Sequence, residues 1–171
     1  HHPVLSGGNL AKLVNIDKLT GGHFRALVLD MTYPAGQGAA GMEKALAKLR
    51  ADAEKAVGKY NVLILSDRAV SRDRVAIPAL LACSGVHHHL VRNGLRTSAG
   101  LVVDTGSARE VHHFALLAGY GAEAVCPWLA FETLADMAPA LKVEAKEAKK
   151  RFVKAINKGL LKVMSKMGIS T

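Results

Sequence analysis

Three short runs of apolar residues mark this sequence, and each ends at an aspartate. They are Ala26–Asp30, Val62–Asp67 and Leu101–Asp104, and their aspartates are 37 residues apart. Strands that are buried on both faces are continuous apolar runs, whereas strands with one exposed face alternate apolar and polar residues. None of the three runs alternates. An interval of this length accommodates a strand, a loop and a crossover helix, so the pattern predicts repeated βα units with polar residues at the strands' carboxyl ends.

The segments between these runs have the spacing of helices. Apolar residues recur at helical spacing from Met42 to Val57, Pro78 suits the first turn of a helix, and Gly94 suits a helix end. We expect strands over residues 24–30, 62–65, 101–103 and 124–128, helices over 42–58, 78–93 and 108–118, and a loop over 33–41. The predicted fold class is α/β, with about four βα units and a mainly parallel sheet that resembles a partial (β/α) barrel.

The two ends of the chain add a lead-in and a long helix. Residues 1–20 have a weak pattern, so we expect an N-terminal lead-in with a short helix capped by Asn9. His1 and His2 could derive from a purification tag. Residues 21–171 form the predicted central α/β domain. The apolar run near residues 164–171 would ordinarily continue into another element, so we expect a domain cut from a longer chain.

The net charge of +9 first suggests a polyanion as the partner. Most of the excess lies between Lys142 and Lys166, where apolar residues are interleaved with the lysines at helical spacing. This pattern is typical of an amphipathic helix with a basic, solvated face, which we favour over a nucleic-acid site. The sequence has no apolar run of membrane-spanning length and no signal peptide. Cys83 and Cys126 form no Cys-x-x-Cys pair, which favours a reducing compartment such as the cytoplasm.

Two motifs suggest cofactors but have unsuitable spacing. Gly36–Gly41 matches the G-x-G-x-x-G pattern of dinucleotide-binding loops, yet five residues separate it from the preceding strand, which argues against a dinucleotide site. The histidines in 87–89 and 112–113 are consecutive, so they fan out around a helix instead of converging on a metal. We expect these rings to pair with backbone or carboxylate groups or to be exposed.

Polar residues at the strand ends are the candidates for chemistry. They should gather at one edge if the strands are adjacent, where they could hold an acid, a base or an anion. The same residues could equally cap the following helices or form loop ion pairs, for example between Asp67 and a nearby arginine. We favour this structural role because the sequence has no nucleophile motif and no phosphate loop. The candidates are Asp30, Asp67, Arg68, Asp104, Thr105, Arg109 and Glu132.

Longer strings in the chain resemble a known family. They are Ala26–Thr32, Leu63–Arg68, Ile77–Leu81, Val103–Ala115, Leu117–Ala122, Pro127–Leu134 and Ile156–Thr171. These strings closely resemble the large subunit of glutamate synthase. The resemblance runs from Pro3 onward and falls in the central domain, which in that family joins the glutamine amidotransferase domain to the flavin-binding synthase domain.

The resemblance implies a parent enzyme whose catalytic machinery lies outside this segment. The family makes glutamate from glutamine and 2-oxoglutarate, with ammonia passing through an internal tunnel to a site with flavin mononucleotide (FMN) and a 3Fe-4S cluster. No catalytic, cofactor-binding or metal-binding residue of that machinery maps onto this chain. The expected partners are the flanking amidotransferase and synthase domains, and ferredoxin or a small electron-transfer subunit. A parent of the ferredoxin type would place the chain in a plastid.

Two alternatives from other classes stay open. One is a free-standing small α/β enzyme, or a phosphate- or flavin-binding module, that uses the strand-end loops. The other is an anion-binding module built on the basic helix. The supporting role implied by the resemblance predicts no activity for the isolated chain. A cut barrel also exposes strand edges and apolar surface, which favours self-association.

Overall fold

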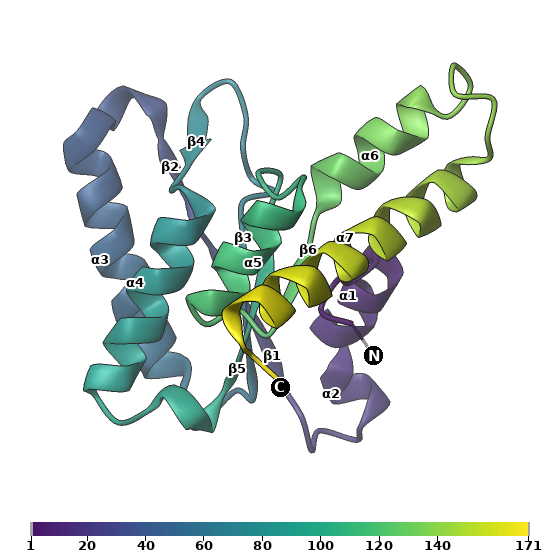
Figure 1. Ribbon diagram of the computed structural model, residues 1–171. Coiled ribbons are helices and arrows are strands. Elements are labelled where there is room, and N and C mark those ends of the chain that lie inside the picture. Colours follow the sequence, from purple (N-terminus) through teal and green to yellow (C-terminus); the bar gives the residue numbers. More distant parts are fainter. Residues whose placement is uncertain (1, 171) are drawn as a thin grey trace.

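A four-stranded parallel sheet forms the centre of the computed structural model, which describes residues 2–170 (Figure 1). Its strands lie in the order β1-β3-β5-β6. Their bounds are β1 Ala26–Asp30, β3 Val62–Ser66, β5 Gly100–Asp104 and β6 Ala124–Cys126. The predicted α/β class and parallel sheet are therefore confirmed. Within the described chain the sheet is open, with β1 and β6 at its two ends.

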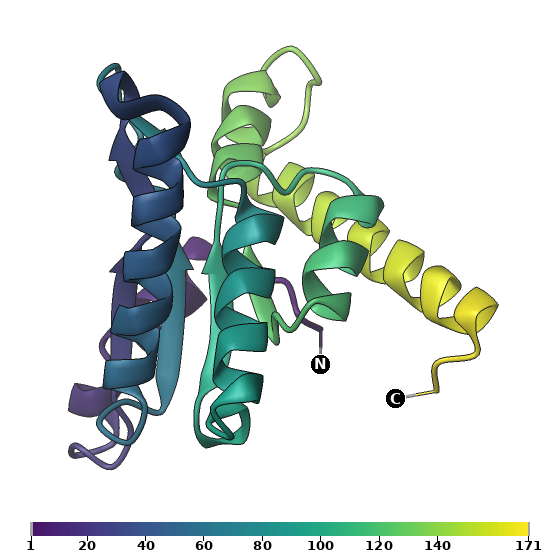
Figure 2. The ribbon, with the colours of Figure 1, turned by 90° about the vertical axis from the view of Figure 1, so that its left-hand side faces the viewer.

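The helices between successive strands all cover one face of the sheet (Figure 2). They are α3 (Gly38–Ala56), α4 (Ala79–Arg92) and α5 (Val111–Gly119). The leucines and valines of the strands pack against them in the main core, with Leu63, Leu65 and Val103 fully buried. Sequential strand order with crossover helices on one face is the arrangement of a segment of a (β/α) barrel, since a doubly wound sheet carries helices on both faces.

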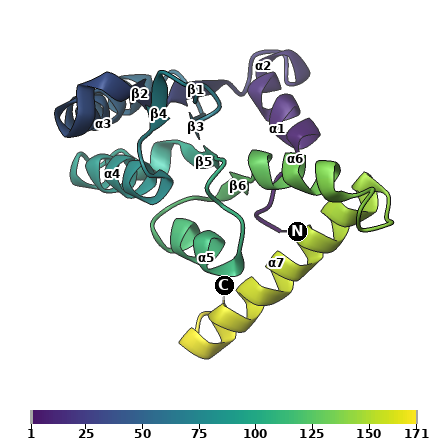
Figure 3. The ribbon, with the colours of Figure 1, turned by 90° about the horizontal axis from the view of Figure 1, so that it is seen from above.

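The N-terminal residues cover part of the opposite face (Figure 3). Helices α1 (Gly7–Val14) and α2 (Ile16–Leu19) lie there, and Leu10 packs on Ile64 and Val102. The helix cap predicted at Asn9 is wrong, because α1 begins three residues earlier. Ser6 is the cap, and its Oγ accepts the backbone N–H of Asn9 at 3.1 Å.

A small second sheet replaces part of the predicted 33–41 loop. Strand β2 (Thr32–Pro34) pairs antiparallel with β4 (Arg74–Ala76), so two loops at the carboxyl edge are joined. A short 3₁₀ turn, η1 (Ala35–Gln37), follows β2, and a second turn, η2 (Arg96–Ser98), precedes β5. Helix α3 begins at Gly38, which has φ of 56° and turns the chain into the helix.

Two further helices complete the chain. The strand predicted over 124–128 is too long, because α6 (Trp128–Met137) begins directly after Pro127. Helix α7 (Ala145–Met167) is the predicted basic helix, and it packs across α5 and α6. Phe152 of α7 makes edge-to-face contacts with aromatic rings of both helices, at centroid distances of 6.3 Å to Phe114 and 6.0 Å to Phe131.

Candidate functional site

The register of the strands places one of the three regularly spaced aspartates out of line with the other two. Asp30 pairs with Ser66, and Ser66 pairs with Asp104, so Asp67 lies one position beyond the line of the other two. Side chains alternate between the faces of a strand, so this single step turns Asp67 away from Ser66 and Asp104. The carboxyl edge of the sheet therefore carries two polar networks.

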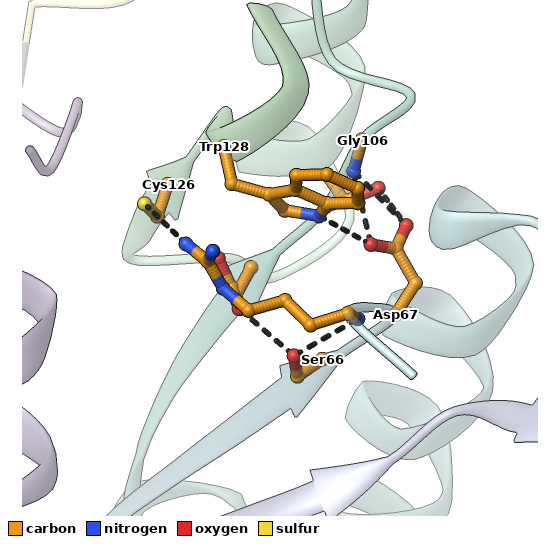
Figure 4. A network of polar contacts seen from close by, with 8 residues as sticks. Ser66, Asp67, Gly106, Cys126 and Trp128 are labelled. Atoms are coloured by element: carbon orange, nitrogen blue, oxygen red, sulfur yellow. Dashed lines mark hydrogen bonds and ion pairs between the residues drawn. The ribbon is translucent and has the colours of Figure 1, made fainter. Parts of the chain in front are cut away.

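The first network centres on Asp104, which is 2% exposed. Its Oδ2 accepts hydrogen bonds from Ser66 Oγ at 2.8 Å and from Arg68 Nε at 2.7 Å (Figure 4). Burial opposes the charge of Arg68, but the hydrogen bond and the charge of Asp104 outweigh it and raise the pKa of the guanidinium. The guanidinium also lies over the ring of Trp128, 5.4 Å from its centroid.

The second network centres on Asp67, which is 4% exposed. Three groups donate hydrogen bonds to its carboxylate: Thr105 Oγ1 at 2.6 Å, the backbone N–H of Gly106 at 3.0 Å and Trp128 Nε1 at 2.6 Å. A Cβ on Gly106 would lie only 3.1 Å from the Trp128 ring, so the close approach favours glycine. Asp67 thereby ties together β3, the loop after β5 and the start of α6 (Figure 4).

The remaining sequence candidates lie apart from these networks. Asp30 accepts the backbone N–H of Thr32 and faces Arg74 Nη2 at 3.5 Å. Arg109 is exposed and forms no ion pair in the described chain, and Glu132 is exposed on α6, where it lines the cavity beside Arg68. The predicted gathering is thus confirmed for only part of the set, namely Asp67, Arg68, Asp104 and Thr105.

The helix capping predicted for the strand-end residues is wrong, and so is the ion pair predicted for Asp67, although Asp104 and Asp30 do pair with arginines. In the part of the chain that the structure describes, Asp67 forms no ion pair with a neighbouring arginine, because Trp128 and Thr105 occupy its carboxylate. The strand-end residues also do not cap α3, α4 or α5, whose cap positions make no side-chain hydrogen bond. Loops separate those strand ends from the helix starts, so these residues pair with one another across the sheet edge instead; Asp104 Oδ1 alone among their oxygens is buried without a partner within residues 2–170.

Sequence reasoning missed Ser66 and Trp128 as members of these networks. Ser66 stands immediately before Asp67, and only the strand register reveals that it faces Asp104. Trp128 is the only tryptophan in the sequence, and a largely buried indole N–H requires an acceptor. This need for an acceptor, which a buried aspartate can meet, is the sequence signal that could have identified Trp128 as a member of the network.

The cysteines do not supply a nucleophile at this edge. Burial and the nearby Asp104 carboxylate raise the pKa of the Cys126 thiol to about 12. Burial raises the pKa of the Cys83 thiol to about 11. Both groups are therefore neutral thiols at pH 7, and the thiolate is the reactive form of cysteine.

The histidines pair with neighbouring groups, as the sequence predicts. His89 Nε2 lies 2.7 Å from Glu54, and His113 Nε2 lies 3.2 Å from Glu110. His87 Nδ1 accepts a hydrogen bond from Arg96 Nε at 3.0 Å. Within residues 2–170, no three histidine, cysteine or carboxylate side chains lie close enough to hold a metal ion.

A cavity of about 600 Å³ opens beside the first network. Arg68, Cys126 and Trp128 form its wall on the sheet side, and α1 and α7 contribute Gly7 and Lys149. Arginine and lysine side chains and the first residues of α1 therefore line the cavity. No helix in the part of the chain described by the structure is long and apolar enough to cross a membrane.

Fold and site define an open, barrel-like α/β domain whose strand-end polar groups mainly bind its own elements together. The chain belongs to the glutamate synthase central domain family, whose sequence model matches residues 1–171. The predicted family resemblance is thereby confirmed.

Similar proteins are glutamate synthases from several organisms. The chain is 43% identical to glutamate synthase [NADH] of Schizosaccharomyces pombe over 99% of its length and 8% of that protein. It is 46% identical to the glutamate synthase [NADPH] large chain of Bacillus subtilis, over 76% of this chain and 9% of the relative. It is 41% identical to the chloroplastic ferredoxin-dependent glutamate synthase of Oryza sativa, over 98% of this chain and 11% of the relative. The chain therefore spans about a tenth of these relatives.

Proposed function

We propose that this domain is a rigid link in a glutamate synthase. In this role it supports an amidotransferase domain and an FMN-containing synthase domain, and it keeps their sites in register while ammonia passes from one to the other. The overall reaction is the formation of glutamate from glutamine and 2-oxoglutarate. The isolated domain has no activity of its own in this proposal.

The observation that carries the proposal is the internal pairing of the strand-end residues. In α/β enzymes this edge presents groups to a ligand. Here Asp67 instead joins three separate elements through buried hydrogen bonds. Such a network resists relative movement of those elements, because opening it leaves buried polar groups unpaired. A stiff support suits the transfer of a small neutral intermediate between distant sites.

Cofactors and electron donor belong to other parts of the enzyme in this proposal. Cys83 and Cys126 are buried in α4 and β6, which does not favour a shared iron–sulfur cluster. We place the FMN and the 3Fe-4S cluster outside this segment. The names of the relatives include ferredoxin-, NADH- and NADPH-dependent types, so the donor is either ferredoxin or a small subunit that uses a pyridine nucleotide. The location follows the type, a plastid for a ferredoxin enzyme and the cytoplasm otherwise.

The test uses a full-length glutamate synthase that contains this domain. Trp128→Phe removes the indole N–H that reaches Asp67 but keeps an aromatic ring. We expect glutamine hydrolysis and ammonia-dependent glutamate synthesis to persist separately. The glutamine-dependent reaction should become uncoupled, with more glutamine hydrolysed than glutamate formed from 2-oxoglutarate. Asp30→Asn, on an exposed carboxylate outside the network, serves as the control. Unchanged coupling in a folded Trp128→Phe enzyme would contradict the linking role.

A second measurement addresses the free-standing enzyme alternative. FMN added to the isolated chain should leave its melting temperature unchanged, because a ligand stabilises only a folded state that binds it. A clear rise in melting temperature with FMN would favour a flavin-binding module over a linking domain.

A further inference from the structure

The cavity beside Arg68 has the composition of an anion site. It lies where the N-terminal segment and α1 meet α6 and α7, which come together in Figures 1 and 3. We propose that this basic cavity binds a small organic molecule carrying two or more negative charges on phosphate or carboxylate oxygens. The term basic cavity refers to the space lined by Gly7, Gly8, Arg68, Trp128, Lys149 and Lys150.

Arg68 is held with its outer edge available to a ligand. Its Nε is fixed by the buried carboxylate of Asp104, and its guanidinium plane rests on Trp128. The side chain is nonetheless 43% exposed, and its terminal nitrogens make only a long contact of 3.9 Å to Cys126 Sγ. A guanidinium held in this way can donate two parallel hydrogen bonds to an oxyanion without first losing conformational freedom.

The start of α1 supplies two further donors. Ser6 satisfies the N–H of Asn9, whereas the N–H groups of Gly7 and Gly8 have no partner among the hydrogen bonds of residues 2–170. Both residues are glycines that line the cavity, and a Cβ on Gly7 would meet no atom within 4 Å. Backbone N–H groups there are open to a ligand, and the positive end of the helix dipole adds to their attraction.

Helix α7 completes the positive lining. Lys146, Lys149 and Lys150 share one face of the helix by their spacing, and all three line the cavity. None of them forms an ion pair within the described chain, and the only acidic residue in the lining is Glu132. With Arg68, four cations thus line the cavity with Glu132, and Asp104 behind the wall balances the charge of Arg68. A bound dianion would relieve their mutual repulsion.

The size and walls of the cavity favour a small organic molecule over a bare ion. Its volume of about 600 Å³ lies in the usual range for ligand pockets. Beside the cations it is lined by Val4, Phe131 and Val153, together with the Trp128 ring. A ligand with an anionic group near Arg68 and an apolar or aromatic body along these side chains would use both parts of the wall.

The test titrates the 171-residue chain with inorganic phosphate and, separately, with citrate at constant ionic strength. Amide NMR spectra report on Gly7 and Gly8, and the indole signal reports on Trp128. We expect saturable shifts at these three groups. The anion that binds with the higher affinity shows whether the cavity prefers phosphate or carboxylate oxygens. The Lys149→Gln, Lys150→Gln double variant should weaken binding about fivefold or more.

Control variants separate a built site from general charge attraction. Lys162→Gln and Lys158→Gln together remove the same charge from the same helix but lie outside the cavity, so binding should be unchanged. All four lysines are on the surface of α7 or only half-buried, so both double variants should fold. Shifts that fail to saturate, or that weaken equally in both double variants, would overturn the proposal. Absence of binding by both probes would overturn it as well.

Discussion

Asp67 and Asp104 follow neighbouring strands, yet their carboxylates serve separate networks. Asp104 pairs with a half-exposed arginine, whereas Asp67 receives only neutral donors. Both carboxylates are nearly inaccessible to solvent. At such positions an unmade hydrogen bond costs more than a made one gains, because the orphaned group is still desolvated. The stability of the carboxyl edge should therefore depend on each donor's finding its acceptor.

Asp67→Asn tests this dependence at a single residue. The amide keeps one acceptor oxygen but brings an NH₂ group toward the donors of Thr105, Gly106 and Trp128. We expect the free energy of unfolding in urea to fall by about 1–3 kcal/mol. The exposed Asp30, with its long contact to Arg74, provides a matched Asp→Asn control that should lose less than about 1 kcal/mol. Equal losses in the two variants would show that burial of Asp67 adds nothing.

His87 gives the domain a pH-dependent stability. Burial, the charge of Arg96 and the neighbouring His88 lower the pKa of His87 below its ordinary value of 6.5. The unfolded chain therefore takes up a proton on this residue at a higher pH than the folded chain. Stability should be fully present above pH 6.5 and should decline as the pH falls from there through the lower folded-state pKa.

Urea unfolding at neutral and mildly acidic pH measures this contribution. His87→Gln keeps a polar side chain but has no titration, so its stability should fall less on acidification than that of the parent chain. His23→Gln changes an exposed histidine and should keep the parent's pH dependence. If the His87→Gln and parent chains lost equal stability on acidification, another group would be responsible.

At the scale of elements, continuous apolar runs were sufficient to predict the four parallel strands. In β3 and β5 alternate side chains are buried against the crossover helices and against the N-terminal helices, so the continuous runs record burial on both faces. The small sheet of β2 and β4 was not predictable in the same way. Its three-residue strands depend on the contact between two loops, and strand β2 contains Pro34. Similarly, Ala124–Trp128 was predicted as one strand because a short apolar run does not distinguish strand from helix start.

The sequence was sufficient to predict that the candidate residues lie at the carboxyl edge of the sheet, but not which of them contact one another. The sequence places the aspartates after the strands, and this much is observed. The one-residue offset of Asp67 depends on pairing register, and register is a property of two strands at once. The pairing of Arg68 with Asp104, 36 residues away, follows from the same register.

Helix α7 contacts α5 through a glycine at which packing should outweigh helix propensity. A Cβ on Gly159 would meet all three side-chain carbons of Val111, with Cγ1 at 2.8 Å and Cβ at 3.1 Å. An alanine in an open helical position would gain about 1 kcal/mol over glycine. At this contact we expect Gly159→Ala to cost about 1–3 kcal/mol instead, because α5 and α7 must move apart.

A double-mutant cycle isolates that contact. Adding Val111→Ala to Gly159→Ala should recover stability relative to Gly159→Ala alone, giving a coupling of about 1 kcal/mol or more in denaturant unfolding. Gly85 in α4 offers a matched control, since the one close contact of its Cβ would be the far end of the Leu46 side chain at 3.1 Å, with ordinary contacts to Leu46 Cγ at 3.8 Å and Arg50 Cδ at 3.9 Å. Gly85→Ala should be close to neutral. A stabilising effect of Gly159→Ala would show that the helices have room at this point.

At the scale of the whole molecule, the two sides of the sheet are unequally protected. Helices α3, α4 and α5 cover one face, whereas α1 and α2 cover only part of the other. The N-terminal segment covers the outer edge of β6. The Leu5 N–H donates to the Val125 carbonyl, and the Val125 N–H donates to the Pro3 carbonyl. Within residues 2–170, strand β1 has a partner on one side only, and its Val28 is 46% exposed. An unpaired edge beside exposed apolar surface is a template for association.

We therefore expect the 171-residue chain to self-associate through β1 as its concentration rises, which sedimentation velocity would detect. Val28→Lys places a charge on that edge, and charged side chains oppose edge-to-edge pairing, so this variant should stay monomeric over the same range. Val91→Lys is a matched control, because Val91 is 50% exposed on α4, away from the edge. It adds the same charge and should leave association intact. Equal suppression by both lysines would attribute the effect to net charge, and a monomeric parent chain would show that β1 is adequately protected as it stands.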